Sequence, residues 1–144
     1  MSSDLVEITL LSLAVSGAAT LVSLLIGLPI GTWLALKRFR SRHLVLSVVN
    51  TGMALPPVVA GLFIAVLLWR SGILGGLGLM YTPGAMVIAE VVIATPIVMG
   101  LTVAALGQLD PRLQLQLQGL GASRRQTVWW LWREARLPLL AAVM

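Results

Sequence analysis

Three long apolar runs constrain this chain more than any other feature. They cover residues 5–36, 44–69 and 85–106. The core of a bilayer is about 30 Å thick and takes about 20 apolar residues of helix to cross, so each run is long enough to span it. Only 10% of the residues are charged, against about 25% in a soluble domain. We therefore expect an all-α, polytopic membrane helical bundle with three full spans and the start of a fourth.

The positive charges predict how these spans are oriented. All but one of the ten Lys and Arg residues fall in two segments. The first segment contains Lys37, Arg38, Arg40 and Arg42, and the second contains Arg112, Arg124, Arg125, Arg133 and Arg136. Two spans separate the segments, so both lie on one side, and the positive-inside rule makes that side the cytoplasm. We expect a multi-pass protein of the cytoplasmic (inner) membrane with its N-terminus outside. Topology and attraction to lipid headgroups explain the basic charge, so nucleic acid is not an expected partner.

Several classes of chemistry are disfavoured by composition. The chain has no Cys and one His, His43, which stands among basic residues without other ligand types. No metal site or cofactor is therefore expected. The glycine-rich segment 71–78 lacks the Gly-Lys-Ser/Thr of a phosphate loop. Apart from Glu7 at the start of the first run, the spans contain one acid, Glu90. We expect no catalytic residue and no enzymatic activity.

The first apolar run combines a helix start with closely spaced small residues. Asp4 suits the first turn of a helix that begins near Ser3 or Asp4. Pro29 removes a backbone donor and is expected to bend this helix. Gly27 and Gly31 are four residues apart, the spacing that lets two membrane helices approach closely.

The second run contains two consecutive prolines, Pro56 and Pro57, soon after Asn50 and Thr51. Each proline removes an N–H group, and Pro57 disfavours the helical conformation at Pro56. Carbonyl groups freed inside a membrane must find partners or line a wet cavity. We expect a break in the helix here and take these four residues as pore or gate candidates. A purely structural kink is the alternative.

The third run, which begins near Pro83, contains one acid and a further proline. Glu90 inside a span is a functional candidate by default. The alternative is a neutral or paired acid that faces the bundle, with Arg70 as the partner. Thr95 and Pro96 predict a break in mid-span, where the threonine hydroxyl could satisfy a freed carbonyl. We add both residues to the gate candidates.

The polar stretch 107–136 is expected to hold helices of its own. Asp110 followed by Pro111 is a helix start, and Ser123 is a second N-cap. Three tryptophans with flanking arginines then predict an amphipathic helix at the membrane interface. Connections this long are uncommon unless they have a function, so we expect this stretch to dock a partner.

The last apolar run, 137–144, is too short to cross a membrane. Eight residues of helix extend about 12 Å, and a half-span would leave carbonyl groups unsatisfied in hydrocarbon. We therefore expect this chain to be a C-terminally truncated part of a protein with further helices.

The polar stretch resembles the cytoplasmic loop of ABC importer permeases. In that family the loop reads Glu-Ala-Ala, three residues, then Gly-Ala. Gly121 and Ala122 match the second part, whereas residues 115–117 depart from the first. The closing Leu-Pro corresponds to Leu137 and Pro138. Their wider spacing from the glycine, and the segment 50–62, are similar to the tungstate/molybdate-type branch of the oxyanion permeases.

The resemblance implies a function and partners. It makes residues 1–144 a partial permease domain whose stretch at about 107–136 is the coupling loop. The membrane subunit would import an inorganic oxyanion, most consistently tungstate. ATP would be hydrolysed on a separate ABC ATPase subunit, an extracytoplasmic binding protein would deliver the anion, and a second permease copy would complete the pore. The residues implied for ATPase coupling are Gly121, Ala122, Ser123, Arg124 and Arg125.

Two other classes of function remain open from the sequence. A membrane anchor or adaptor without transport activity, or an inactive permease remnant, would also explain the charge and the length. It does not explain the two-part loop with Gly121 and Ala122. A membrane-embedded enzyme would need converging polar residues that the spans do not offer.

Overall fold

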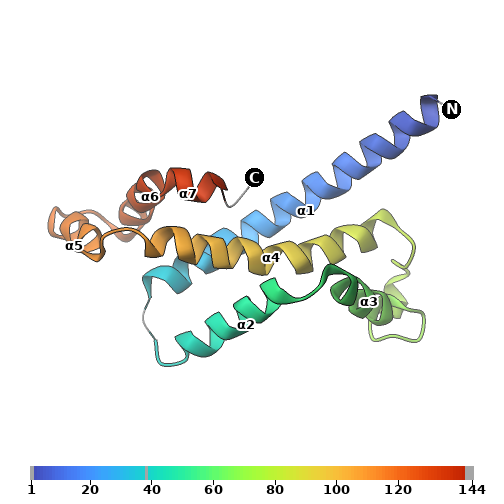
Figure 1. Ribbon diagram of the computed structural model, residues 1–144, viewed down its shortest axis with the longest axis horizontal. Coiled ribbons are helices and arrows are strands. Elements are labelled where there is room, and N and C mark those ends of the chain that lie inside the picture. Colours follow the sequence, from blue (N-terminus) through green and yellow to red (C-terminus); the bar gives the residue numbers. More distant parts are fainter. Residues whose placement is uncertain (1, 38, 142–144) are drawn as a thin grey trace.

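The computed structural model describes residues 2–37 and 39–141, with side chains described for 4–37 and 39–140. Arg38 of the basic turn and the final residues 142–144 of the last apolar run lie outside this range. The described residues form helices and turns without a strand, which confirms the all-α membrane bundle. The elements, shown in Figure 1, are α1 (Ser2–Leu36), α2 (Arg42–Ala54), α3 (Pro57–Leu68), the 3-10 helix η1 (Gly75–Leu77), α4 (Pro83–Gly107), α5 (Pro111–Gly119), α6 (Arg124–Glu134) and α7 (Arg136–Ala141).

Two described helices, α1 and α4, are each long and apolar enough to cross a membrane. The pair α2 and α3 passes the same test only when taken together, and the two helices are bent by 99° where they meet. The described residues thus hold two spans, or three if the bent pair counts as one. The second apolar run of the sequence is this broken element rather than a straight helix.

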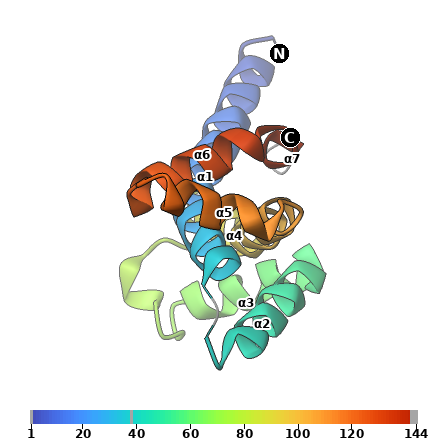
Figure 2. The same cartoon turned by 90° about the vertical axis from the view of Figure 1, so that its left-hand side faces the viewer.

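Helices α1 and α4 lie side by side and run in the same direction (Figures 1 and 2). Their contact is built on Gly27 and Gly31, as the spacing predicted. A carbon added at Gly27 would lie 2.7 Å from Val98 Cγ1, and one added at Gly31 would lie 2.9 Å from the Met99 carbonyl oxygen. The buried positions Val15, Ala19, Ser23, Gly27 and Gly31 recur every four residues along α1. Small side chains therefore let the two backbones approach.

The break at the double proline is confirmed in detail. Helix α2 ends at Ala54, and Leu55 and Pro56 are extended, with ψ of 123° and 132°. Each precedes a proline, whose ring disfavours the helical region for the residue before it. Pro57 then opens α3 at a position where a missing N–H costs nothing.

The break expected at Thr95 and Pro96 is wrong, because α4 continues unbroken from Pro83 to Gly107. The Thr95 hydroxyl donates to the Val91 carbonyl (2.6 Å), and not to the Val92 carbonyl that a proline four residues later leaves without its usual donor. Packing explains why the helix persists. On one side Gly27 of α1 lies against the Thr95 carbonyl, and on another a carbon added at Gly52 of α2 would lie 2.9 Å from Pro96 Cβ. Helix α1 likewise runs unbroken through Pro29.

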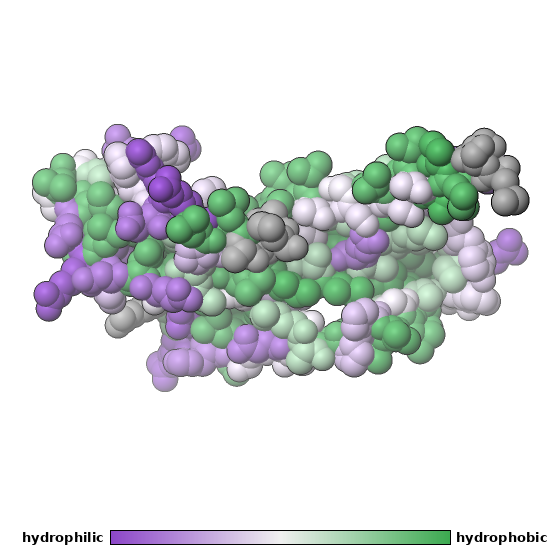
Figure 3. All heavy atoms as spheres, turned by 45° about the horizontal axis from the view of Figure 1, so that its top comes forward, coloured by the Kyte–Doolittle hydropathy of each residue, from purple (hydrophilic) through white to green (hydrophobic). Residues whose placement is uncertain are grey.

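The surface is apolar over the spans and polar at one end. Figure 3 shows hydrophobic residues along the body of the molecule and hydrophilic ones gathered at the end that holds α5 and α6. The first half of α1 extends beyond α4 (Figure 1) with large exposed side chains such as Leu5, Ile8 and Leu13. Such a surface suits lipid or further helices rather than water.

Candidate coupling loop and gate residues

The two basic segments of the chain meet at one end of the molecule. The turn after α1 and the start of the polar stretch line a common cavity of about 680 Å³, which includes Phe39, Arg42 and His43 from the first segment and Asp110 and Pro111 from the second. The Arg42 Nε–H group also donates to the Leu34 carbonyl (3.0 Å), which fastens the turn to α1. The expectation that both segments lie at the same end is therefore confirmed.

The polar stretch predicted to be a coupling loop begins with α5, whose start is built as the sequence predicted. The Asp110 carboxylate accepts a hydrogen bond from the backbone N–H of Arg112 (2.8 Å), and Pro111 occupies the first helical position. An aspartate cap satisfies a donor that a helix start leaves unpaired. The alternation of Leu and Gln in residues 113–118 therefore belongs to a helix rather than to a strand.

Gly121 and Ala122 close α5 with a single compact cap. Gly121 has a φ of +84°, a left-handed conformation that costs other L-residues roughly 1–2 kcal/mol. Its N–H donates to the Gln118 carbonyl, and the N–H of Ala122 donates to the Leu117 carbonyl, both at 3.0 Å. This pair of bonds is the Schellman motif, in which glycine is favoured. The turn therefore requires glycine at position 121, whereas Ala122 contributes only its backbone N–H.

Ser123 starts the next helix immediately after this cap. Its hydroxyl accepts from the backbone N–H of Gln126 (3.4 Å), and the Gln126 side chain accepts from the N–H of Ser123 (2.8 Å). This reciprocal arrangement is a capping box. Three consecutive residues, Gly121 to Ser123, thus end one helix and begin another, which fixes the direction of the chain between α5 and α6.

Helix α6 is fastened to the spans by its buried face. Leu131 and Ala135 pack into a cluster with Leu106 at the end of α4. The Trp132 indole N–H donates to the Thr32 hydroxyl of α1 (3.0 Å) across 100 positions of sequence. Sequence reasoning missed this bond, although the four-residue spacing of Thr127, Leu131 and Ala135 was the signal for a buried face. The loop is therefore held by both α1 and α4.

The opposite face of α6 is exposed and carries aromatic and cationic side chains. Trp129 and Trp130 are 55% and 44% exposed, and the guanidinium carbon of Arg133 lies 5.5 Å and 5.1 Å from their ring centroids. Helix α6 is thus amphipathic, as predicted. Arg124 and Arg125 are exposed at its first turn.

The gate candidates come from two helices that touch. Gly52 of α2 packs on Pro96 of α4, so the segment that leads to the double proline lies against the middle of α4. Asn50, Thr51, Pro56 and Pro57 are exposed, and Thr95 is half-buried. The Thr51 hydroxyl donates to the Ser47 carbonyl of its own helix (2.8 Å), whereas the side chain of Asn50 makes no such bond within the described residues. Asn50 is therefore the gate candidate whose donors are free.

Glu90 is half-buried on α4. The ion pair with Arg70 that the sequence suggested is wrong for this structure, since neither side chain has an ionic partner among the described residues. No group of three or more His, Cys, Asp or Glu side chains within those residues could hold a metal ion.

Comparison with known proteins identifies the family whose sequences this chain resembles. Residues 27–144 match the profile of the family described as "binding-protein-dependent transport system inner membrane component". A probable anion ABC transporter permease protein of Haloferax volcanii is 34% identical over 97% of this chain and 60% of its own length. A tungstate uptake system permease protein of Peptoclostridium acidaminophilum is 32% identical over 95% and 60%, and a molybdenum transport system permease protein of Haemophilus influenzae is 31% identical over 90% and 58%. The chain therefore spans about 60% of the length of these relatives.

Proposed function

Because this chain belongs to the family of binding-protein-dependent transport system inner membrane components, we propose that it is the membrane permease part of an ABC importer for an inorganic oxyanion. The family is one of membrane components, so the chain itself is not an enzyme. Relatives named for anion, tungstate and molybdenum transport support the class of substrate. Our first candidate is tungstate. ATP hydrolysis belongs to a partner subunit, and an extracytoplasmic binding protein supplies the anion.

The observation that carries this proposal is the rigid two-helix element formed by α5 and α6. Coupling needs an element that transmits movement of a partner to the spans without bending. Its direction is set by the Gly121 cap and the Ser123 capping box, and it is fastened to α4 through Leu131 and to α1 through Trp132. We propose that residues 121–125 face the ATPase, with Arg125 exposed toward it.

The orientation in the membrane follows from the same element. The positive-inside rule places both basic segments in the cytoplasm, and the structure brings them to one end. Helices α1 and α4 run in the same direction, so the N-terminus of α1 is proposed to lie outside.

We propose that the anion passes beside the broken element between α2 and α3, in a pore that a second permease copy completes. Asn50 offers free side-chain donors there, and the hydroxyls of Thr51 and Thr95 would reach an anion by leaving the Ser47 and Val91 carbonyls of their own helices. The extended residues before Pro57 leave backbone groups that only a wet or protein-lined site can satisfy. Glu90 is not proposed as an anion ligand, because an ionised carboxylate would repel a dianion.

The test is transport by the reconstituted system. The full natural polypeptide would be placed in proteoliposomes with its ATPase subunit and binding protein, and uptake of tungstate, molybdate and sulfate would be compared. ATP-dependent tungstate uptake is the expected result. Failure of the polypeptide to bind any ATPase subunit would overturn the permease assignment and favour an anchor or adaptor. Binding without tungstate uptake would overturn only the choice of substrate.

A further inference from the structure

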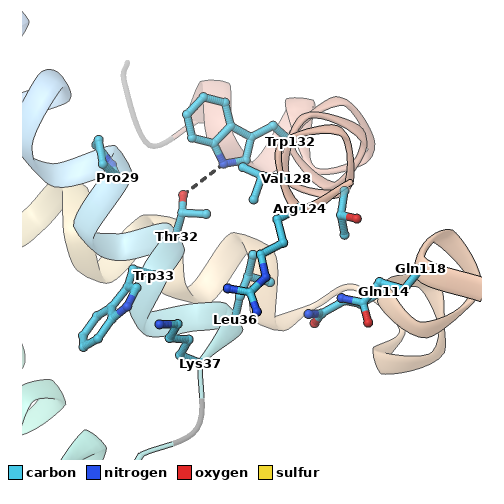
Figure 4. A pocket seen from close by; sticks show the side chains of 11 residues that line it. Pro29, Thr32, Trp33, Leu36, Lys37, Gln114, Gln118, Arg124, Val128 and Trp132 are labelled. Carbon is cyan, nitrogen blue, oxygen red and sulfur yellow. Dashed lines mark hydrogen bonds between the residues drawn. The ribbon is translucent and has the colours of Figure 1, made fainter. Parts of the chain in front are cut away.

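A pocket of about 630 Å³ lies between the last turns of α1 and the coupling helices α5 and α6. Of its lining residues, Arg124 also belongs to the segment 121–125 that we propose to face the ATPase. Figure 4 shows its polar wall: Arg124 extends from α6 toward Leu36 and Lys37 at the end of α1, and the amides of Gln114 and Gln118 stand beside it on α5. The pocket therefore joins the end of a span to the coupling element.

The polar wall is suited to an anion. Two cations, Lys37 and Arg124, line the pocket together with the two glutamines of α5, and none of the described lining residues is acidic. Neither cation has a carboxylate partner within the described residues. The Lys37 ammonium lies 5.7 Å from the ring centroid of Trp33, a contact that leaves its N–H groups available. A planar guanidinium and an ammonium on the wall of one pocket suit the several acceptor oxygens of a phosphate.

The remaining wall is apolar and continues along α1. Pro29 and Leu36 of α1 lie across the pocket from Val128 and Trp132, whereas the Trp33 ring points to the side of α1 away from α6 (Figure 4). Trp33 and Trp132 stand at the end of the span, where aromatic side chains mark the boundary between hydrocarbon and headgroups. A ligand that fills this pocket thus needs an anionic head and an apolar tail.

We propose that this pocket binds a phosphate group, presented by an anionic phospholipid whose acyl chain lies along α1. Lys37 and Arg124 hold the phosphate, and the amides of α5 donate to its remaining oxygens. Basic pockets at the cytoplasmic ends of membrane helices are suited to such headgroups. A lipid bound here bridges α1 and the coupling element. Free phosphate shares the head chemistry but leaves the apolar wall unused.

The test compares lipid retention by matched variants. The full natural polypeptide would be reconstituted in phosphatidylcholine nanodiscs that contain phosphatidylglycerol, extracted with mild detergent, and examined for retained lipid by native mass spectrometry. In Lys37→Gln/Arg124→Gln, we expect retention of phosphatidylglycerol to fall roughly 25-fold, since each of the two cations near the headgroup contributes on the order of a fivefold preference and the two factors multiply. The control Arg40→Gln/Arg112→Gln removes the same charge from exposed positions outside the pocket and should change retention less than twofold.

A second measurement needs no variant and covers the case in which the double variant does not fold. A photoactivatable phosphatidylglycerol should crosslink the unmodified protein within residues 29–37 or 124–132. Titration with inorganic phosphate in lipid-free detergent distinguishes a lipid headgroup from free phosphate as the ligand. If inorganic phosphate binds and the binding requires Lys37 and Arg124, the pocket is an anion site whose ligand is a free ion. Equal lipid retention in all three proteins, or crosslinks confined to other segments, would overturn the proposal.

Discussion

The α1–α4 interface and the turn between α5 and α6 both depend on glycine, but for different physical reasons. At the interface, Gly27 and Gly31 have ordinary helical backbones and are required because a side chain would strike Val98 or the Met99 carbonyl. At the turn, no atom lies within 4 Å of a carbon added at Gly121, and its φ of +84° is what demands glycine. The α1–α4 interface requires residues without a side chain, and the turn between α5 and α6 requires a residue that tolerates a positive φ. Substitutions can therefore break each region separately.

The largest effect is expected from filling the interface. Gly31→Leu places a side chain against backbone and against Thr102, neither of which can move without separating α1 from α4. We expect a loss of about 3 kcal/mol or more, at the upper end of overpacking costs, seen as a lower temperature of thermal aggregation in detergent. Gly17→Leu is the matched control on the same helix, because nothing lies within 4 Å of that position. An equal loss of stability in both variants would show that close packing at Gly31 is not the cause, because leucine favours a helix more than glycine does at either position.

The next effect separates conformation from volume. Gly121→Ala adds one methyl group in open space, yet forces alanine into the left-handed region at a cost of roughly 1–2 kcal/mol. If the loop docks the proposed ATPase subunit, we expect weaker binding of that subunit in a pull-down from proteoliposomes, with the spans intact. Gly119→Ala is the control in the same loop, since Gly119 also faces open space but belongs to helix α5. Unchanged binding in Gly121→Ala would contradict a rigid coupling turn.

A smaller effect is expected from the start of α6. Ser123→Ala removes the hydroxyl that accepts from Gln126 and should cost about 1 kcal/mol, as N-cap removals do. Hydrogen exchange of the first turn of α6 is the measurement, and faster exchange confined to residues 124–127 is expected. Ser123→Asp keeps an acceptor at the cap and should restore protection, whereas an exchange rate as fast as that of Ser123→Ala would argue against the capping box.

These comparisons also separate what the sequence predicted from what it did not. The caps at Asp110 and Ser123, the break at Pro57 and the close approach at Gly27 and Gly31 depend on neighbours in the chain or on a four-residue spacing, so local chemistry was sufficient to predict them. The 99° bend between α2 and α3 could not be predicted in the same way, because two consecutive prolines predict where a helix breaks but not the angle between the two parts.

Two further misses arose from tertiary packing. Pro96 would break an isolated helix, but α1 and α2 pack around it and α4 remains continuous. The bond between Trp132 and Thr32 joins residues 100 positions apart, and the tryptophan alone predicted only an interfacial side chain. The pocket that we propose to bind a lipid is lined by the same two residues and joins segments far apart in the chain, so no local pattern predicts it.

The smallest expected effect tests the hydrogen bond that joins helix α6 to helix α1. Trp132→Phe keeps an aromatic ring but removes the N–H that donates to Thr32. A typical hydrogen bond contributes about 0.5–1.5 kcal/mol, so thermal stability should fall only slightly.

If this bond transmits movement between coupling loop and span, ATP hydrolysis should continue while transport per ATP falls. Thr32→Val removes the acceptor with little change of volume and should reproduce the effect, and the double variant should add nothing. Additive losses would show that the two side chains act independently, and the coupling path would then run through Leu131 and the end of α4.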